Sequence, residues 1–158
     1  MAVPQEIERK FIVKDDGWRR HVSSAKRIRQ GYIAQGPRAN VRARITDASF
    51  ATLSIKSVNP GMVRQEYEYP IPVEEAENLL GICEGAMIEK TRNIIVAGLH
   101  TWEIDVFEGE NAGLVIAELE LKSIDEEFAR PDWLGKEVTD DERYYNAALV
   151  LNPFSRWS

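Results

Sequence analysis

The sequence contains one cysteine, two histidines and no long apolar run. Cys83 has no second cysteine to pair with, which excludes an internal disulfide and a cysteine-based zinc site. A membrane helix needs about 20 consecutive apolar residues, and charged residues interrupt every apolar stretch well before that length. The charged stretch 6–10 also stands where a signal peptide would have its apolar core. These absences predict a protein of the reducing cytoplasm.

Positive charge is also in deficit. The chain has 20 Lys and Arg against 26 Asp and Glu, a net charge of −6. Because non-specific binders of nucleic acid and of anionic membranes use a basic surface, we expect neither partner. With 158 residues, of which 44% are hydrophobic, the chain can bury one substantial core. No repeat or linker divides it, so residues 1–158 are predicted to form a single domain.

Short runs that alternate apolar and polar residues dominate the sequence, and this alternation predicts β-strands. Turn-forming pairs such as Gly36-Pro37 and Ala97-Gly98 separate many of the runs. The expected strands cover residues 5–13, 28–34, 40–46, 50–57, 63–71, 87–96, 100–107 and 114–121.

Three segments have helical features. Residues 15–21 form a short, weak candidate, and residues 73–80 follow Pro72 and end before Gly81. Near the C-terminus, Thr139 and Glu142 have the spacing of a capping box. This spacing predicts an N-cap at Thr139 and a helix that continues to about residue 151.

On most expected strands the polar positions are ionisable. QEIERKFIV places Glu6, Glu8 and Lys10 on one side of a strand, because successive side chains alternate between its two faces. VRARI places Arg42 and Arg44 in the same way. The same spacing recurs in LSIK, RQEYE, EKTRN, WEIDVF and AELELK.

A solvated face explains any one of these strands, because antiparallel sheets often have one wet side. Such faces usually also contain Thr, Ser, Gln and Asn, whereas here like charges are neighbours. Positions i and i+2 lie about 6.6 Å apart, where two like charges repel by roughly 2.5 kcal/mol at an effective dielectric of 20. Converging faces would therefore need counter-charges. Carboxylates suit a hard divalent metal, and Arg and Lys suit phosphate oxygens.

Converging charged faces predict the architecture. We expect an α+β protein with an eight-stranded antiparallel closed β-barrel, whose tunnel has a charged lumen and which carries a few peripheral helices. Closure would also remove the exposed edges of the sheet. The apolar outer wall must then be covered by those helices or by another subunit, which makes a homodimer possible.

In their order along the chain, these motifs resemble the CYTH superfamily, also called the triphosphate tunnel metalloenzymes. The first match is the ExExK pattern at residues 6–10, and the short bacterial branch that hydrolyses inorganic tripolyphosphate is the most similar. The later matches are RQGY at 29–32, VRAR at 41–44, LSIK at 53–56, RQEYE at 64–68, EKTR at 89–92, EIDVF at 103–107, ELEL at 118–121 and EVTDDERYYN at 137–146.

The resemblance implies a tunnel that binds a linear triphosphate together with Mg²⁺ or Mn²⁺. The residues that match phosphate ligands are Lys10, Arg42, Arg44, Lys56, Lys90 and Arg92. Those that match metal ligands are Glu6, Glu8, Glu118 and Glu120, with Glu66, Glu68 and Asp105 in supporting positions. Lys10 and Tyr32 match a lysine–tyrosine dyad proposed to activate water, in which Tyr32 is the candidate general base.

The resemblance favours metal-dependent hydrolysis of tripolyphosphate, and the absence of a GxxxxGK[ST] loop is consistent with a tunnel in place of a Walker site. Two alternatives stay open: a class IV adenylate cyclase or thiamine triphosphatase, and a non-catalytic module that binds polyphosphate or nucleotide. The sequence also leaves open whether Lys136 reaches the tunnel mouth. It assigns Arg143 to the C-terminal helix, and Arg64 and Glu103 to structural ion pairs.

Overall fold

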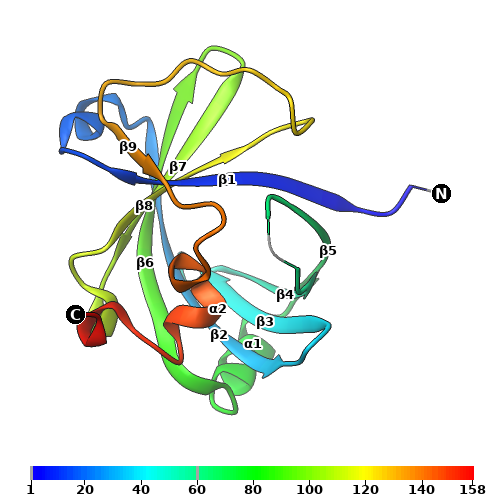
Figure 1. The fold of residues 1–158 in the computed structure, drawn as a ribbon. Helices are drawn as coiled ribbons and strands as arrows, with labels where there is room; N and C mark the ends of the chain where they lie inside the picture. The colour runs from blue at the N-terminus through cyan, green and yellow to red at the C-terminus, as the bar shows by residue number, and fades with distance from the viewer. Residues whose placement is uncertain (1, 60) are drawn as a thin grey trace.

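Alternating sequences build one antiparallel sheet in the order β5-β4-β3-β2-β6-β7-β8-β1-β9. The computed structural model describes residues 2–59 and 61–158. Pairing between β1 and β5 closes β1 to β8 into a ring and leaves β9 outside it, beside β1 (Figure 1). The strands are β1 (Gln5–Val13), β2 (Ser24–Gln35), β3 (Ala39–Thr46), β4 (Phe50–Ser57), β5 (Val63–Ile71), β6 (Glu84–Ala97), β7 (His100–Phe107), β8 (Val115–Glu120) and β9 (Leu134–Glu137). The closed antiparallel barrel predicted from the sequence is confirmed.

Three features of the strands differ from the prediction. Strands β2 and β6 both begin earlier than expected. The additional residues do not alternate between apolar and polar, but they still pair with the neighbouring strand, as Ala25 of β2 does with Asn93 of β6. Strand β9 was not expected, since it has only four residues. Its Gly135 packs so close to β1 that an added Cβ would lie 2.7 Å from the Ile12 carbonyl oxygen, which explains the need for glycine there.

Two groups of elements cover the apolar outer wall. Helix α1 (Val73–Leu80), which the sequence predicted, packs Ala76 and Leu80 against Ala43 and Ile45 of β3. On the opposite side, Trp102 of β7 is buried in a second cluster with residues of β1, β8 and β9. A short 3₁₀ helix, η1 (Gly17–His21), buries its tryptophan in the same cluster, where a weak helix was expected. In the part of the chain that the structure describes, no helix is long and apolar enough to cross a membrane.

The C-terminal segment corrects the predicted capping box. Thr139 is not an N-cap, because its buried Oγ1 accepts a hydrogen bond from the Lys10 backbone N–H at 3.0 Å. The carboxylate of Asp141 instead accepts a hydrogen bond from the Arg143 backbone N–H and begins the 3₁₀ helix η3 (Glu142–Tyr144). The expected long helix is reduced to α2 (Asn146–Leu149), which is followed by η4 (Phe154–Arg156). A further 3₁₀ turn, η2 (Gly109–Asn111), precedes β8.

The lumen-facing positions change from charged to apolar toward one end of the barrel. Ile88 of β6, Phe107 of β7 and Ile116 of β8 are buried there in one cluster. Leu149 and Val150 of the C-terminal segment pack into the same cluster. The C-terminal segment is therefore fixed against the interior of the barrel, next to the charged part of the lumen.

Candidate active site

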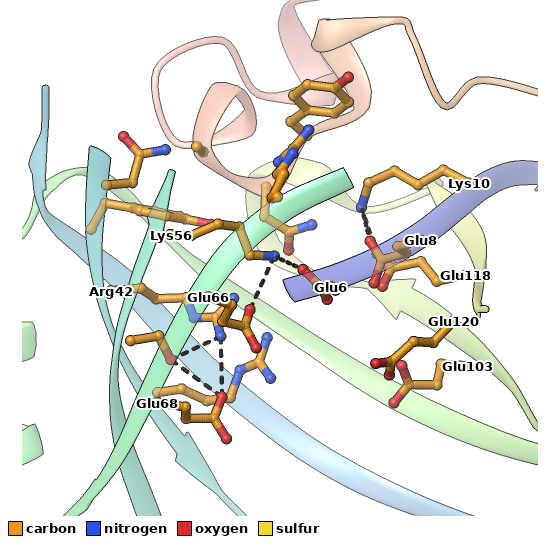
Figure 2. A pocket seen from close by; sticks show the side chains of 18 of the residues that line it. Glu6, Glu8, Lys10, Arg42, Lys56, Glu66, Glu68, Glu103, Glu118 and Glu120 are labelled. Atoms are coloured by element: carbon orange, nitrogen blue, oxygen red, sulfur yellow. Dashed lines mark hydrogen bonds and ion pairs between the residues drawn. The ribbon is translucent and has the colours of Figure 1, made fainter. Parts of the chain in front are cut away.

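Charged side chains from the ring of strands converge on one cavity with a volume of about 280 Å³ (Figure 2). The alternate positions therefore do face a shared interior. Of the residues that the sequence singled out, the lining contains Glu6, Glu8, Lys10, Tyr32, Arg42, Arg44, Lys56, Glu66, Glu68, Lys90, Arg92, Glu118 and Glu120. Asp105 is fully buried behind this lining.

One wall of the cavity, the carboxylate wall, is formed where β1 pairs with β8. The antiparallel register places Lys10 opposite Glu118 and Glu8 opposite Glu120. Lys10 Nζ donates to Glu118 Oε1 at 2.7 Å and lies 3.4 Å from Glu8 Oε1. In Figure 2 these acids lie together with Glu103, on the side of the cavity away from Arg42 and Glu68. The strand register thus gathers carboxylates around a single ammonium group.

Carboxylates on this wall have unequal proton affinities. Burial raises the pKa of Glu8 to about 8, and the neighbouring Glu118 carboxylate acts in the same direction. Burial also disfavours ionisation of Glu118, but Lys10 and Arg92 outweigh it and hold the pKa of Glu118 well below its usual range. This wall therefore has an excess of negative charge that a cation would relieve.

Replacement of Glu8 by glutamine should make stability less dependent on pH. Because the pKa of Glu8 is raised from 4.5 to about 8 in the folded protein, the folded state binds a proton more tightly than the unfolded state. Stability is therefore lost as the pH rises through this window. Without added metal, Glu8→Gln should have nearly the wild-type melting temperature at pH 5 and exceed it by roughly 10 °C at pH 9. Thermal unfolding measures this difference, and the exposed Glu127→Gln is the control. An equal difference at both pH values would contradict the assignment.

Asp105 organises the cations of β6. Lys90 Nζ donates to Asp105 Oδ2 at 2.7 Å. Arg92 donates to the same carboxylate from Nε and from Nη2, both at 2.8 Å. Asp105 thus contacts two of the lining cations from behind.

Two cations near Asp105 lie in surroundings that disfavour their charged forms. Burial lowers the pKa of Lys90 to about 7; Asp105 opposes this shift and Arg92 adds to it. Burial also lowers the pKa of Arg44 to about 9, assisted by the positive charges of Arg42 and Arg92. An anion placed among these groups would stabilise their charged forms.

Arg42 retains an unused hydrogen-bond donor. Its Nη2 donates to Ser54 Oγ at 3.2 Å and lies 3.8 Å from Glu68 Oε2. Its Nε is buried and has no hydrogen-bond partner among the residues that the structure describes. Since an unsatisfied buried donor is costly, a ligand oxygen in the cavity would be favoured here.

On the wall formed by β4 and β5, one lysine is shared by two acids. Lys56 Nζ lies 2.7 Å from Glu6 Oε2 and 3.3 Å from Glu66 Oε2. Glu66 is the register partner of Lys56, whereas Glu6 arrives from β1 across the seam that closes the barrel. This contact depends on closure of the ring.

Tyr32 lies at the boundary between the charged lumen and the apolar cluster. It lines the cavity but is largely buried with Ile88 and Leu149. Within residues 2–59 and 61–158 no hydrogen bond joins Tyr32 to Lys10, whose ammonium group donates to Glu118 instead. The lysine–tyrosine dyad is therefore not a directly bonded pair in this structure, and the role of Tyr32 stays a hypothesis.

Sequence reasoning missed several lining residues. Arg64 and Glu103 lie on the alternating charged faces, so their spacing was the available signal; Glu103 pairs with Arg92 at 3.2 Å. Arg64 stacks on Tyr145, with its guanidinium carbon 4.4 Å from the ring centroid. The sequence considered Arg64 and Glu103 only as ion-pair partners, and the lining residues that it missed altogether are Asn40, Ser54, Tyr145, Asn146 and Ala147.

Lys136, whose placement was left open, and Arg143, which was assigned to the C-terminal helix, both lie outside the cavity. Lys136 and Arg143 belong to a separate surface depression along residues 136–143 and do not line the cavity. Arg143 pairs with Asp141 at 2.7 Å and lies over the rings of Tyr144 and Trp157, so it fixes the C-terminal segment.

The acids have the chemistry of a site for a hard divalent metal, but they do not form a complete cage. Among residues 2–59 and 61–158 no group of three or more His, Cys, Asp or Glu side chains is gathered for metal binding. Mg²⁺ is commonly held by one or two carboxylates together with water and substrate phosphates. The carboxylates of β1 and β8 fit this mode, in which the ligand completes the coordination.

Comparison with known proteins places the chain in a family. The profile of the CYTH domain matches residues 4–146, and the chain therefore belongs to the CYTH domain family. A curated inorganic triphosphatase of Acetivibrio thermocellus is 46% identical over 157 residues, which cover 97% of each chain. An inorganic triphosphatase of Nitrosomonas europaea is 37% identical over 152 residues, 93% of this chain and 97% of the relative. The crystal structure of an inorganic triphosphatase, 37% identical, superposes with a TM-score of 0.66 over 92% of this chain and 97% of the other.

Proposed function

We propose that the protein hydrolyses inorganic tripolyphosphate, or a closely related linear triphosphate, inside the barrel with the help of Mg²⁺ or Mn²⁺. The observation that carries the proposal is a single cavity lined by Arg and Lys side chains, one of which, Arg42, has a buried Nε without a hydrogen-bond partner among the described residues. Carboxylates on the facing wall have the chemistry that a divalent cation needs. The similarity to two inorganic triphosphatases over nearly the whole chain supports the same conclusion.

Phosphoryl transfer depends mainly on positioning and on neutralising charge. The basic wall of the cavity consists of Arg42, Arg44, Lys56, Lys90 and Arg92. These side chains would bind the phosphate oxygens and hold the chain of phosphates in line. The carboxylates Glu6, Glu8, Glu118 and Glu120 would hold the metal ion, which polarises a phosphoryl oxygen or orients water when bound. Lys10 and Tyr32 would act on the attacking water, with Tyr32 as the proton acceptor. Attack on a terminal phosphorus breaks its bridging P–O bond and releases orthophosphate and pyrophosphate.

The purified protein should release orthophosphate from tripolyphosphate when Mg²⁺ or Mn²⁺ is added. Because Lys10 is proposed to act on the attacking water and on the phosphate, Lys10→Ala should lower kcat by roughly 100-fold or more. A colorimetric phosphate assay measures both rates. Release no faster than that of Lys10→Ala under either metal would refute the proposal.

The same preparation can be tested against the alternatives. Formation of cyclic AMP from ATP would identify an adenylate cyclase, and faster cleavage of thiamine triphosphate than of tripolyphosphate would identify a thiamine triphosphatase. Tight binding of tripolyphosphate without turnover under either metal would identify a binding module.

We also propose that the chain acts as one domain in the reducing cytoplasm, in line with its single cysteine. The exposed side chains of Ile55 and Tyr69, which point outward from β4 and β5, support a homodimer. Sedimentation of the purified protein measures this state directly.

A further inference from the structure

Asn146 of α2 accepts two hydrogen bonds at the edge of the cavity. Its Oδ1 lies 2.9 Å from Lys90 Nζ and 3.0 Å from Gln30 Nε2. Gln30 is fully buried, and its own Oε1 accepts from Arg44 Nε at 2.7 Å. A continuous chain of hydrogen bonds therefore connects the C-terminal segment to two cations of the basic wall.

The direction of each bond in this chain is fixed by chemistry. Lysine and arginine can only donate. Gln30 must therefore turn its oxygen toward Arg44 and its amide nitrogen toward Asn146, and Asn146 must turn its oxygen toward Lys90 and Gln30. No flipped arrangement of either amide satisfies all three bonds.

The segment that carries Asn146 is held independently of this side chain. Leu149 and Val150 are buried, and the Val150 carbonyl accepts from the Ala86 backbone N–H at 2.9 Å. Gly85 has φ +71°, and an added Cβ would lie 2.4 Å from the same carbonyl oxygen, so β6 and the segment meet closely. Gln35 Nε2 also donates to the Ala147 carbonyl at 2.9 Å. Asn146 is thus an acceptor in a fixed position.

We infer that Asn146 is a positioning residue for phosphate binding, which orients Lys90 directly and Arg44 through Gln30. This inference rests on the proposed function. Asp105 holds the Lys90 ammonium on one side and Asn146 holds it on the other. Two of its three N–H groups are then occupied, and the third is left for a substrate oxygen.

Loss of the Asn146 amide should weaken substrate binding more than it slows the reaction. Lys90 would lose one of its two anchors, and the amide of Gln30 would lose its acceptor. Because an ammonium group that binds phosphate stabilises the bound substrate and the transition state alike, Asn146→Ala should raise KM by roughly tenfold. The kcat should stay within about threefold of wild type.

Gln35→Ala is the matched control. It removes a hydrogen bond to the neighbouring residue of the same segment but touches no cation of the cavity. We expect wild-type KM and kcat for this variant. Amide hydrogen exchange at Ala86 reports whether the segment stays docked, and it should be slow in wild type and in both variants. If Asn146→Ala does not fold, Asn146→Ser is measured in its place with the same expectations.

Each outcome decides the inference. A KM for Asn146→Ala equal to that of wild type would overturn it, with the proposed function intact. A shared rise in KM for Asn146→Ala and Gln35→Ala, with fast exchange at Ala86, would also overturn it, because docking of the segment and not the amide would then be responsible. If wild type does not hydrolyse tripolyphosphate, the proposed function fails. The role of Asn146 is then tested by measuring the binding of tripolyphosphate with calorimetry. Weaker binding by Asn146→Ala than by wild type and Gln35→Ala supports the inference, and equal binding or none overturns it.

Discussion

Replacing Asp105 with asparagine should destabilise the protein by about 3–5 kcal/mol. The carboxylate is fully buried and is shared by Lys90 and Arg92. Asparagine has nearly the same shape but cannot neutralise two buried cations. Lys90 would lose its carboxylate partner, and Arg92 would keep only Glu103 and Glu118. Urea unfolding, followed by circular dichroism, measures the change in the free energy of unfolding. Phosphate release should fall in parallel, because both cations line the cavity.

Asp141→Asn is the control for this prediction. Asp141 makes the same two-point contact with an arginine, Arg143, but does so at the surface. Since exposed ion pairs contribute little, this variant should lose only a small fraction of the stability that Asp105→Asn loses. Similar losses in the two variants would show that burial of the Asp105 carboxylate is not the cause.

Glu118→Gln should impair the use of the metal more than any other change on the carboxylate wall. Glu118 is 4% exposed and accepts a hydrogen bond from Lys10. The amide keeps the shape of the side chain but removes the charge that would attract a divalent cation. We expect the Mg²⁺ concentration for half-maximal activity to rise roughly tenfold or more and kcat to fall by about 100-fold. Phosphate release measured across a Mg²⁺ titration gives both quantities.

Glu66→Gln separates this effect from a general change in cavity charge. Glu66 lines the same cavity and also pairs with a lysine, Lys56, but it does not belong to the pair of strands β1 and β8. Glu66 lies on β5, which flanks β1 on the side away from β8, so its replacement should leave the Mg²⁺ requirement within about threefold of wild type. An equal rise in that requirement for both variants would mean that the metal is not held at the wall of β1 and β8.

Most of the ring of strands was predictable because its signal is local. In each strand the charged residues recur at every second position, so the face that they occupy follows from strand geometry alone. Strand β9 carried no such signal, since four residues that include Gly135 show no alternation. The pairing of β9 depends on a close approach to β1, which only the folded chain defines.

The C-terminal part of the site could not be predicted from local patterns. The spacing of Thr139 and Glu142 satisfied the capping rule, but the Thr139 hydroxyl accepts from the backbone of Lys10, far away in the sequence. Because Thr139 is hydrogen-bonded to β1, the C-terminal segment does not continue as a helix from this residue, and Tyr145 and Asn146 line the cavity. Long-range hydrogen bonds of this kind compete with local helix propensity, and they cannot be predicted from the spacing of residues along the sequence.

Closure of the barrel has a consequence for how the protein folds. Strand β1 meets β5 through only three register pairs, and it meets β8 through pairs such as Lys10 with Glu118, whose partners are 108 positions apart. Contacts between such distant residues form slowly, because a long loop must be closed before they contribute. The carboxylate wall should consequently assemble as a late event, after the hairpins of the central strands. During synthesis, the pairing of β1 with β8 could form only after β8 had emerged from the ribosome.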